Sequence, residues 1–318
     1  MSAEDWRPRA SLPALRARAA LLAAARGFFA RRGVLEVETP ILSSAAVTDP
    51  HIDSLGTELD GGSYHLSTSP EYAMKRLLAA GCGDIYQICK AFREGERGRW
   101  HNPEFTLIEW YRLGFDDGAL MGEVEALVRE MFAPYRTLGP AERLSYAAAL
   151  ARYAGIDVRT AREAELEEAA ARLGIECPSQ LDRDGKLDLI MGVSVGPRLG
   201  LERPTFVFDY PASQAALARI KSTATAARFE LYLDGLELAN GFHELADASA
   251  QRERFERDLA RRRMLGKREP QADERLLQAL AAGLPDCAGV ALGFDRLVAT
   301  ALRAGRLAEV MAFTIGEA

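Results

Sequence analysis

A charged loop between two apolar runs constrains the fold of this chain more than any other feature of its sequence. The apolar runs cover residues 85–92 and 105–111, and the loop between them carries arginines and glutamates where ordinary turn residues are expected. Two strand-length runs joined in this way predict a β-hairpin with a functional loop. A second hairpin is predicted around Asp234 and Gly235, because an Asp-Gly pair favours the tight two-residue turn.

The remaining elements follow from the same local signals. We predict helices at 13–32, 71–80, 249–266 and 271–282, strands at 34–42, 205–210 and 289–293, and a third hairpin turn at 60–62. Residues 115–200 form a mainly helical segment that is rich in Ala, Glu and Arg. Since hairpins outnumber strand–helix–strand units, the sequence predicts an α+β fold, with an antiparallel sheet of roughly six strands flanked by helices.

Composition narrows the class of protein. A chain of 318 residues with 48% hydrophobic content can bury the core of one domain, so we predict a single domain over 1–318 with a helical insertion at about 115–200. The net charge of −6, without a dense basic block, argues against a protein that grips long nucleic acids. Four scattered cysteines indicate a reducing compartment, and no apolar run is long enough to span a membrane. We therefore expect a soluble cytoplasmic protein.

The Asp-Gly hairpin places two carboxylates together. A two-residue turn pairs Tyr232 with Glu237 and Glu230 with Ala239, so Glu230 and Glu237 share one face as diagonal neighbours. They are either solvated on a surface hairpin or held together by a divalent cation such as Mg²⁺. Simple alternation turns Asn240 to the opposite face, unless a bulge intervenes, for which Gly241 is the candidate.

Two separated arginines are candidates for binding a triphosphate. Arg93 opens the charged loop, and Arg296 lies in the first turn of a helix that follows the Gly-spaced strand 289–293. Glu71 follows Ser69 and Pro70 at a helix start, which is either a capping sequence or part of a site. Chance agreement of all these features in one order along a chain is improbable.

Taken together, these segments resemble the class II aminoacyl-tRNA synthetases. The charged loop resembles motif 2, residues 289–296 resemble motif 3, and the helix and strand up to Pro40 resemble motif 1, which forms the dimer interface in that family. Residues 69–71, 74–77, 101–106 and 240–242 read almost letter for letter like lysyl-tRNA synthetases. Since the chain begins at the helix before motif 1, we expect no anticodon-binding domain. That combination resembles the family of elongation factor P–lysine ligases.

The resemblance implies a role for each matching residue. Arg93 would hold the α-phosphate of ATP and Arg296 the far end of the triphosphate, and these two are the implied catalytic residues. The other residues of the implied ATP site are Glu94, Gly95, Glu96, His101, Asn102, Phe105, Glu237, Leu238 and Gly293. Glu230 and Glu237 would hold Mg²⁺. The implied amino-acid pocket comprises Ser69, Pro70, Glu71, Tyr111, Asn240, Glu244 and Ala291, with Glu109 nearby.

The implied reaction is the activation of (R)-β-lysine by ATP as an adenylate, followed by transfer to a lysine ε-amine of elongation factor P. Two alternatives are a lysine-activating enzyme with a tRNA or small-amine acceptor, and a non-catalytic amino-acid sensor. Two departures from the family pattern bear on the site. Arg93 is followed by both Glu94 and Glu96 as candidates for adenine contact, and Glu96 is preferred. Ala291 stands where lysyl-tRNA synthetases commonly have glycine, and its methyl group is expected to disfavour α-lysine.

Overall fold

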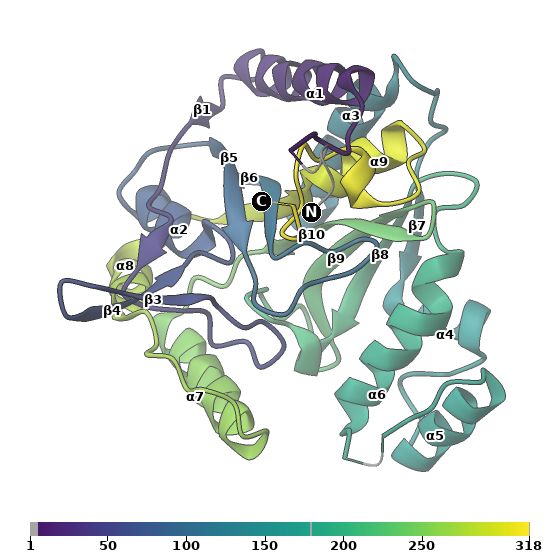
Figure 1. Ribbon diagram of the computed structural model, residues 1–318. Helices are drawn as coiled ribbons and strands as arrows, with labels where there is room; N and C mark the ends of the chain where they lie inside the picture. The colour runs from purple at the N-terminus through teal and green to yellow at the C-terminus, as the bar shows by residue number, and fades with distance from the viewer. Residues whose placement is uncertain (1–5, 179, 318) are drawn as a thin grey trace.

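Two β-sheets organise the chain, whose computed structural model describes residues 6–178 and 180–317 (Figure 1). The larger sheet has eight strands in the order β1-β5-β6-β11-β10-β9-β8-β7, and the smaller has three in the order β2-β4-β3. The strands are β1 (Leu35–Glu36), β2 (Leu42–Ser43), β3 (Gly56–Leu59), β4 (Gly62–Leu66), β5 (Ile85–Phe92), β6 (Glu104–Leu113), β7 (Glu142–Ser145), β8 (Thr205–Pro211), β9 (Thr225–Leu233), β10 (Leu236–His243) and β11 (Cys287–Gly293).

The central strands confirm the predicted α+β class. The six strands from β5 to β8 in the sheet order are antiparallel throughout, as expected from the hairpins. The sheet is wider than predicted, because β1 and β7 add a short parallel strand at each edge. Strand β7 was missed because it lies in the segment that the sequence marks as helical.

Helices surround the larger sheet. They are α1 (Leu12–Ala30), α2 (Glu71–Ala79), α3 (Asp117–Phe132), α4 (Tyr146–Ala154), α5 (Glu163–Arg172), α6 (Arg183–Ile190), α7 (Ala248–Met264), α8 (Glu274–Gly283) and α9 (Phe294–Ala301). Helices α4, α5 and α6 gather at the lower right of Figure 1, while α2, α7 and α8 lie at its left. Whether 115–200 is an insertion into a single domain stays a prediction. None of the helices in the described part of the chain has the length and apolar character needed to cross a membrane.

The predicted strand 34–42 is wrong as one element. The chain forms the two-residue β1 beside β5, leaves the sheet, and forms β2 in the smaller sheet. Pro40 lies between the two pieces and has no amide hydrogen to donate to a ladder, so a continuous paired strand is interrupted there.

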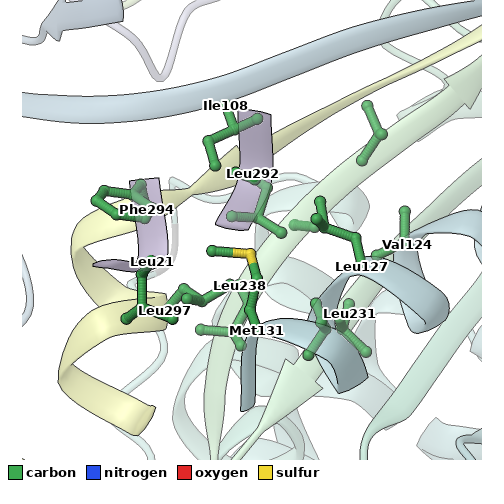
Figure 2. Packing of buried hydrophobic residues seen from close by; sticks show 14 of the residues in the cluster. Leu21, Ile108, Val124, Leu127, Met131, Leu231, Leu238, Leu292, Phe294 and Leu297 are labelled. Atoms are coloured by element: carbon green, nitrogen blue, oxygen red, sulfur yellow. The ribbon is translucent and has the colours of Figure 1, made fainter. Parts of the chain in front are cut away.

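Alternation along the strands separates the two faces of the large sheet. Ile108 and Trp110 of β6, Phe229 and Leu231 of β9, and Leu292 of β11 face a core that α1, α3 and α9 complete. Figure 2 shows this packing around Met131 and Leu297. The residues between them, such as Glu109, Glu230 and Ala291, point to the opposite face. That face carries most of the residues singled out from the sequence.

The second hairpin has a bulge in a different place from the one predicted. Tyr232 pairs with Glu237, but Glu230 pairs with Asn240 and not with Ala239, because the register shifts between Glu237 and Ala239. The extra residue is Leu238, which packs into the core. The shift brings Asn240 to the same face as Glu230 and Glu237. Gly241 has another role, since a Cβ there would lie 2.4 Å from Cζ of Phe229.

Candidate active site

Two adjoining cavities lie over the open face of the sheet. One has a volume of about 440 Å³ and the other about 170 Å³. Both are lined by Arg93, Asn240, Ala291 and Ile52, so these residues mark the junction between them. A molecule in one cavity can therefore meet a molecule in the other next to the Arg93 guanidinium.

The smaller cavity has a cationic lining. Arg296 is held in place by three contacts: its Nε donates to Trp100 O at 3.2 Å, its Nη1 to Glu237 O at 3.1 Å, and its Nη2 to His101 Nε2 at 2.7 Å. Because arginine has no acceptor, His101 must accept here as a neutral imidazole. Burial and the neighbouring Arg296 lower the pKa of His101, which keeps the ring neutral.

Arg93 is poised at the junction with unused donor capacity. Its guanidinium carbon lies 5.0 Å from the centre of the Phe105 ring, and its Nη1 lies 3.4 Å from Glu96 Oε1. Its Nε is buried and has no hydrogen-bond partner among the described residues. A buried, unpaired guanidinium N–H is costly unless a ligand accepts from it. An anionic oxygen at the junction is the group that it fits.

Glu230 and Glu237 lie on the same face near this junction, as the hairpin predicted. Both oxygens of Glu230 are held, one by Arg228 Nη2 and the other by the Tyr232 hydroxyl, each at 2.6 Å. Burial raises the pKa of Glu237 to about 7, and the negative charge of the nearby Glu230 contributes to this shift. Across the described ranges no three His, Cys, Asp or Glu side chains gather as a ready metal site. Two carboxylates still fit a Mg²⁺ ion whose other ligands come from phosphates and water.

The larger cavity has an acidic end. Ser69, Pro70 and Glu71 at the start of α2 line it, together with Asn240. Glu71 also belongs to a cluster with Lys75, Glu109 and Glu244, which lie behind the lining; these four residues are here called the carboxylate cluster. The side chains of Lys75, Glu109 and Glu244 are each at most 2% exposed. Lys75 Nζ lies 2.7 Å from Glu71 Oε1 and 2.6 Å from Glu244 Oε2.

Glu109 occupies a hydroxyl-lined position in the same cluster. Ser69 Oγ donates to one of its oxygens at 2.7 Å, and the Tyr111 hydroxyl donates to the other at 2.8 Å. Burial raises the pKa of Glu109 to about 8, and the negative charge of Glu71 adds to this effect. Burial also raises the pKa of Glu244 to about 7, although Lys75 opposes the shift. Carboxyl groups with raised pKa values beside a cavity mark a candidate functional site.

Small residues of β11 leave room for this arrangement. A Cβ on Gly289 would lie 2.2 Å from Cε1 of Tyr111 and 2.6 Å from Glu244 Oε1. Ala291 pairs with both Glu109 and Asn240 and lies between the cavities. Its methyl group is thus part of the floor on which a ligand would lie.

The structure brings most of the predicted residues to the two cavities. The larger is lined by Ser69, Pro70, Glu71, Arg93, Asn240 and Ala291, and the smaller by Arg93, Glu96, His101, Asn102, Phe105, Glu237, Leu238, Asn240, Ala291, Gly293 and Arg296. Tyr111 and Glu244 lie beneath the lining, as does Glu109. Of the loop glutamates, Glu96 lines the smaller cavity, while Glu94 and Gly95 lie outside the linings described.

Sequence reasoning missed two charged residues of the site. Lys75 is the fourth residue after Glu71 on α2, a spacing that signals a helical ion pair. Arg228 lies two residues before Glu230 on β9, a spacing that puts both on one strand face. Each signal was present, but only the tertiary structure shows that these pairs are buried in the site.

Comparison with known proteins identifies relatives over the whole chain. A family model of tRNA synthetases class II (D, K and N) matches residues 3–316. Proteins from Salmonella dublin, Salmonella arizonae and Salmonella paratyphi B are each 50% identical over an alignment of 323 positions, which covers 98% of this chain and 98% of the relative. All three are named elongation factor P–(R)-β-lysine ligase.

Proposed function

This chain belongs to the class II tRNA synthetase family, and from that premise we propose that it is an ATP-dependent ligase that activates (R)-β-lysine and transfers it to a lysine ε-amine of elongation factor P. The name shared by relatives of full-length similarity supports the substrate and the acceptor. The resemblance seen in the sequence points to the same reaction.

One observation carries the proposal: a cavity that lies over buried carboxylates adjoins a cavity with arginines, and the two meet at Arg93. An amino acid with ammonium groups at the acidic end of the larger cavity directs its carboxylate toward the junction. ATP in the smaller cavity, with Phe105 against adenine and Arg296 at the far phosphates, brings its α-phosphate to the same place. The reacting groups are then held together, which supplies much of the catalysis.

The first step needs no protein nucleophile. The amino-acid carboxylate attacks the α-phosphorus, the bond to the bridging oxygen breaks, and pyrophosphate leaves, giving the aminoacyl-adenylate. Arg93 is placed to stabilise the negative charge that develops on the α-phosphate, and its free Nε–H is a donor for that oxygen. Glu230 and Glu237 would hold Mg²⁺, which would supply positive charge to neutralise the phosphates.

In the second step, the acceptor amine attacks the carbonyl carbon of the adenylate, AMP leaves, and an amide forms. The amine must lose its proton, because the usual pKa of lysine is about 10.4. The proposed arrangement puts the adenylate carbonyl at the junction of the cavities, so the acceptor amine must reach that junction.

We also propose a homodimer formed through residues 13–42. Leu12, Leu35, Ile41 and Leu42 in and beside that segment are large apolar side chains that are exposed in the single chain. In a homodimer formed through this segment, these side chains would be covered by the second copy of the chain. The four cysteines are free, which fits our expectation of a cytoplasmic enzyme.

The test is ATP–pyrophosphate exchange with (R)-β-lysine, (S)-β-lysine or α-lysine, followed by the intact mass of added elongation factor P. Strong exchange with (R)-β-lysine and a mass gain of one lysyl unit are expected. Exchange without a mass gain would move the acceptor to a tRNA or a small amine. A protein that exchanges with none of the three isomers would instead be a sensor.

A further inference from the structure

Lys75 is a buried cation at the base of the amino-acid cavity, and the mechanism above gives it no role. We propose that Lys75 is a positioning residue that fixes Glu71 and Glu244 and sets the charge of the cavity so that it takes an amino acid with two ammonium groups. This inference rests on the proposed function and specifies how that function selects its substrate.

The geometry is that of one ammonium shared by two carboxylates. Lys75 Nζ lies 2.7 Å from Glu71 Oε1 and 2.6 Å from Glu244 Oε2, and these two residues come from α2 and from the segment after β10. The side chain of Lys75 is 2% exposed, so water does not compete for its three donors. The ion pairs therefore hold two carboxylates from distant parts of the chain in one arrangement.

Each of these carboxylates keeps an oxygen that Lys75 does not use. Oε1 of Glu244 is buried without a well-formed hydrogen bond to the described residues. The backbone amide of Gly289, like Lys75, lowers the pKa of Glu244 against the effect of burial. Glu71 lines the larger cavity directly. A buried carboxylate oxygen without a full set of donors is a site for a ligand ammonium.

The charges of the cluster can be compared with those of the substrate. Three carboxylates, of Glu71, Glu109 and Glu244, against the one ammonium of Lys75 leave two unmatched negative charges when all are ionised. A dibasic amino acid supplies two ammonium groups, and its carboxylate is left for Arg93. Without Lys75 the cavity would hold three negative charges, and proton binding would neutralise one.

Other ionisable groups around the cluster do not upset this balance. The hydroxyls of Tyr72 and Tyr111 and the thiols of Cys89 and Cys287 face it, and burial raises the pKa of each group, so all four stay neutral at physiological pH. The other charged residues that line the larger cavity are three acids and three bases, namely Asp49, Asp258, Asp273, Arg76, Arg228 and Arg275. Burial opposes the charge of Lys75 itself, but Glu244 and Glu71 together raise its pKa above the ordinary value. Lys75 is thus the fixed cation of the cluster.

We expect the cluster to hold a proton before the amino acid binds. With its pKa raised to about 8, Glu109 is mostly protonated at neutral pH, and its Ser69 and Tyr111 hydroxyl partners can accept as well as donate. A ligand ammonium favours the ionised form, so binding of the amino acid near pH 7 releases about one proton. Lys75→Met removes the group that lowers the pKa of Glu244, so a further proton must then leave on binding.

The experiment measures binding of (R)-β-lysine to the full chain by calorimetry in buffers of different ionisation enthalpy between about pH 6.5 and about pH 9. The KM of pyrophosphate exchange is measured over the same pH range. For Lys75→Met we expect affinity about tenfold or more weaker near pH 7, greater proton release, and recovery as the pH rises. The kcat at saturating amino acid should change less than KM.

Three further variants make the result specific. Lys75→Arg keeps the charge and should keep the wild-type pH dependence, while Lys75→Gln, which keeps a donor without charge, provides a second test if Lys75→Met does not fold. Lys186→Met is the matched control. Lys186 Nζ lies 2.9 Å from Glu163 and 2.7 Å from Glu167, and its side chain is 2% exposed. It lies on α6, outside the described linings of both cavities, so this variant should leave binding unchanged.

The outcomes separate the inference from the proposed function. Suppose that Lys75→Met and Lys75→Gln each lose affinity by a factor that does not change with pH, or lose no affinity. Lys75 then only fills space and the inference is overturned, while the ligase activity stands. If the wild-type chain neither binds nor exchanges any lysine isomer, the proposed function fails, and the inference fails with it.

Discussion

Glu230 lies opposite Asn240 in the β9–β10 ladder because the bulge at Leu238 moves the strand forward by one residue. This relationship puts a carboxylate and an amide on the same sheet face, and the amide of Asn240 lines both cavities where they meet. Without the bulge Asn240 would point into the apolar core. The bulge therefore determines that Asn240 belongs to the site. The strand next to the bulge is tightly packed at Gly241.

That packing gives a stability prediction at Gly241. Its Cβ would lie 2.4 Å from Cζ of Phe229, a buried ring that packs edge-on against Phe206. Gly241→Ala should lower the free energy of unfolding by about 1–3 kcal/mol. Gly139→Ala is the control, since a Cβ there has no atom within 4 Å, and it should change stability by less than about 0.5 kcal/mol. Equal urea midpoints for the two variants would contradict the prediction.

Arg93 provides a prediction for catalysis. Arg93→Gln removes the guanidinium at the junction, so kcat/KM for pyrophosphate exchange should fall about 10²–10³-fold while the protein stays folded. Arg97→Gln, in the same loop but exposed and outside the described linings, should exchange at close to the wild-type rate. If both variants were equally active, Arg93 would have no part in the chemistry.

The Mg²⁺ proposal predicts a change in metal dependence. Glu237→Gln removes a carboxylate ligand, so the Mg²⁺ concentration for half-maximal exchange should rise about tenfold or more. The control is Glu58→Gln, on the exposed strand β3. An unchanged Mg²⁺ titration for Glu237→Gln would place the metal elsewhere.

Ala291 predicts a change of substrate preference. Its methyl group lies on the floor between the cavities, so Ala291→Gly should make room for an ammonium group at the α-carbon. We expect the ratio of kcat/KM for α-lysine to that for (R)-β-lysine to rise about tenfold or more. An unchanged ratio in pyrophosphate exchange would show that another group selects the isomer.

The buried carboxyls predict how stability depends on pH. The pKa is raised to about 8 for Glu109 and to about 7 for both Glu237 and Glu244, from an ordinary value of 4.5. Between the ordinary pKa of 4.5 and the raised values of about 7 to about 8, the folded protein binds more protons than the unfolded chain. The free energy of unfolding therefore falls as the pH rises through this range. The stabilisation is complete below about pH 4.5 and is lost as the pH passes through 7 to 8.

Urea denaturation without substrates at about pH 5.5 and about pH 8.5 measures this effect. Glu109→Gln cannot titrate, so its stability should fall less over the same interval. A wild-type protein that becomes more stable as the pH rises would contradict the assignment.

The sequence predicted the fold where local signals and tertiary structure agree. The hairpin from Ile85 to Leu113 and the turn at Asp234 and Gly235 formed as expected, because apolar alternation and turn residues act locally. The edge strand β7 was not foreseen, since four residues give no periodicity to detect.

The site was predicted in part for a similar reason. Arg93, Glu71 and Arg296 are read from motifs, but the partners of buried charges depend on contacts between distant segments. Lys75 meets Glu244 only after α2 is packed against the sheet, and no sequence period records that contact. The position of the bulge could not be predicted either, because it depends on Leu238 packing into a core that forms only in the tertiary structure.

Residues that serve the site alternate with residues that serve the core along β6, β9 and β11. A misfolded sheet shifted by one residue would turn Glu109 and Glu230 inward and Trp110 and Leu231 outward. Such a sheet would be too unstable to persist. An error in strand pairing would therefore be cleared as unfolded protein before it could accumulate as a folded but inactive enzyme.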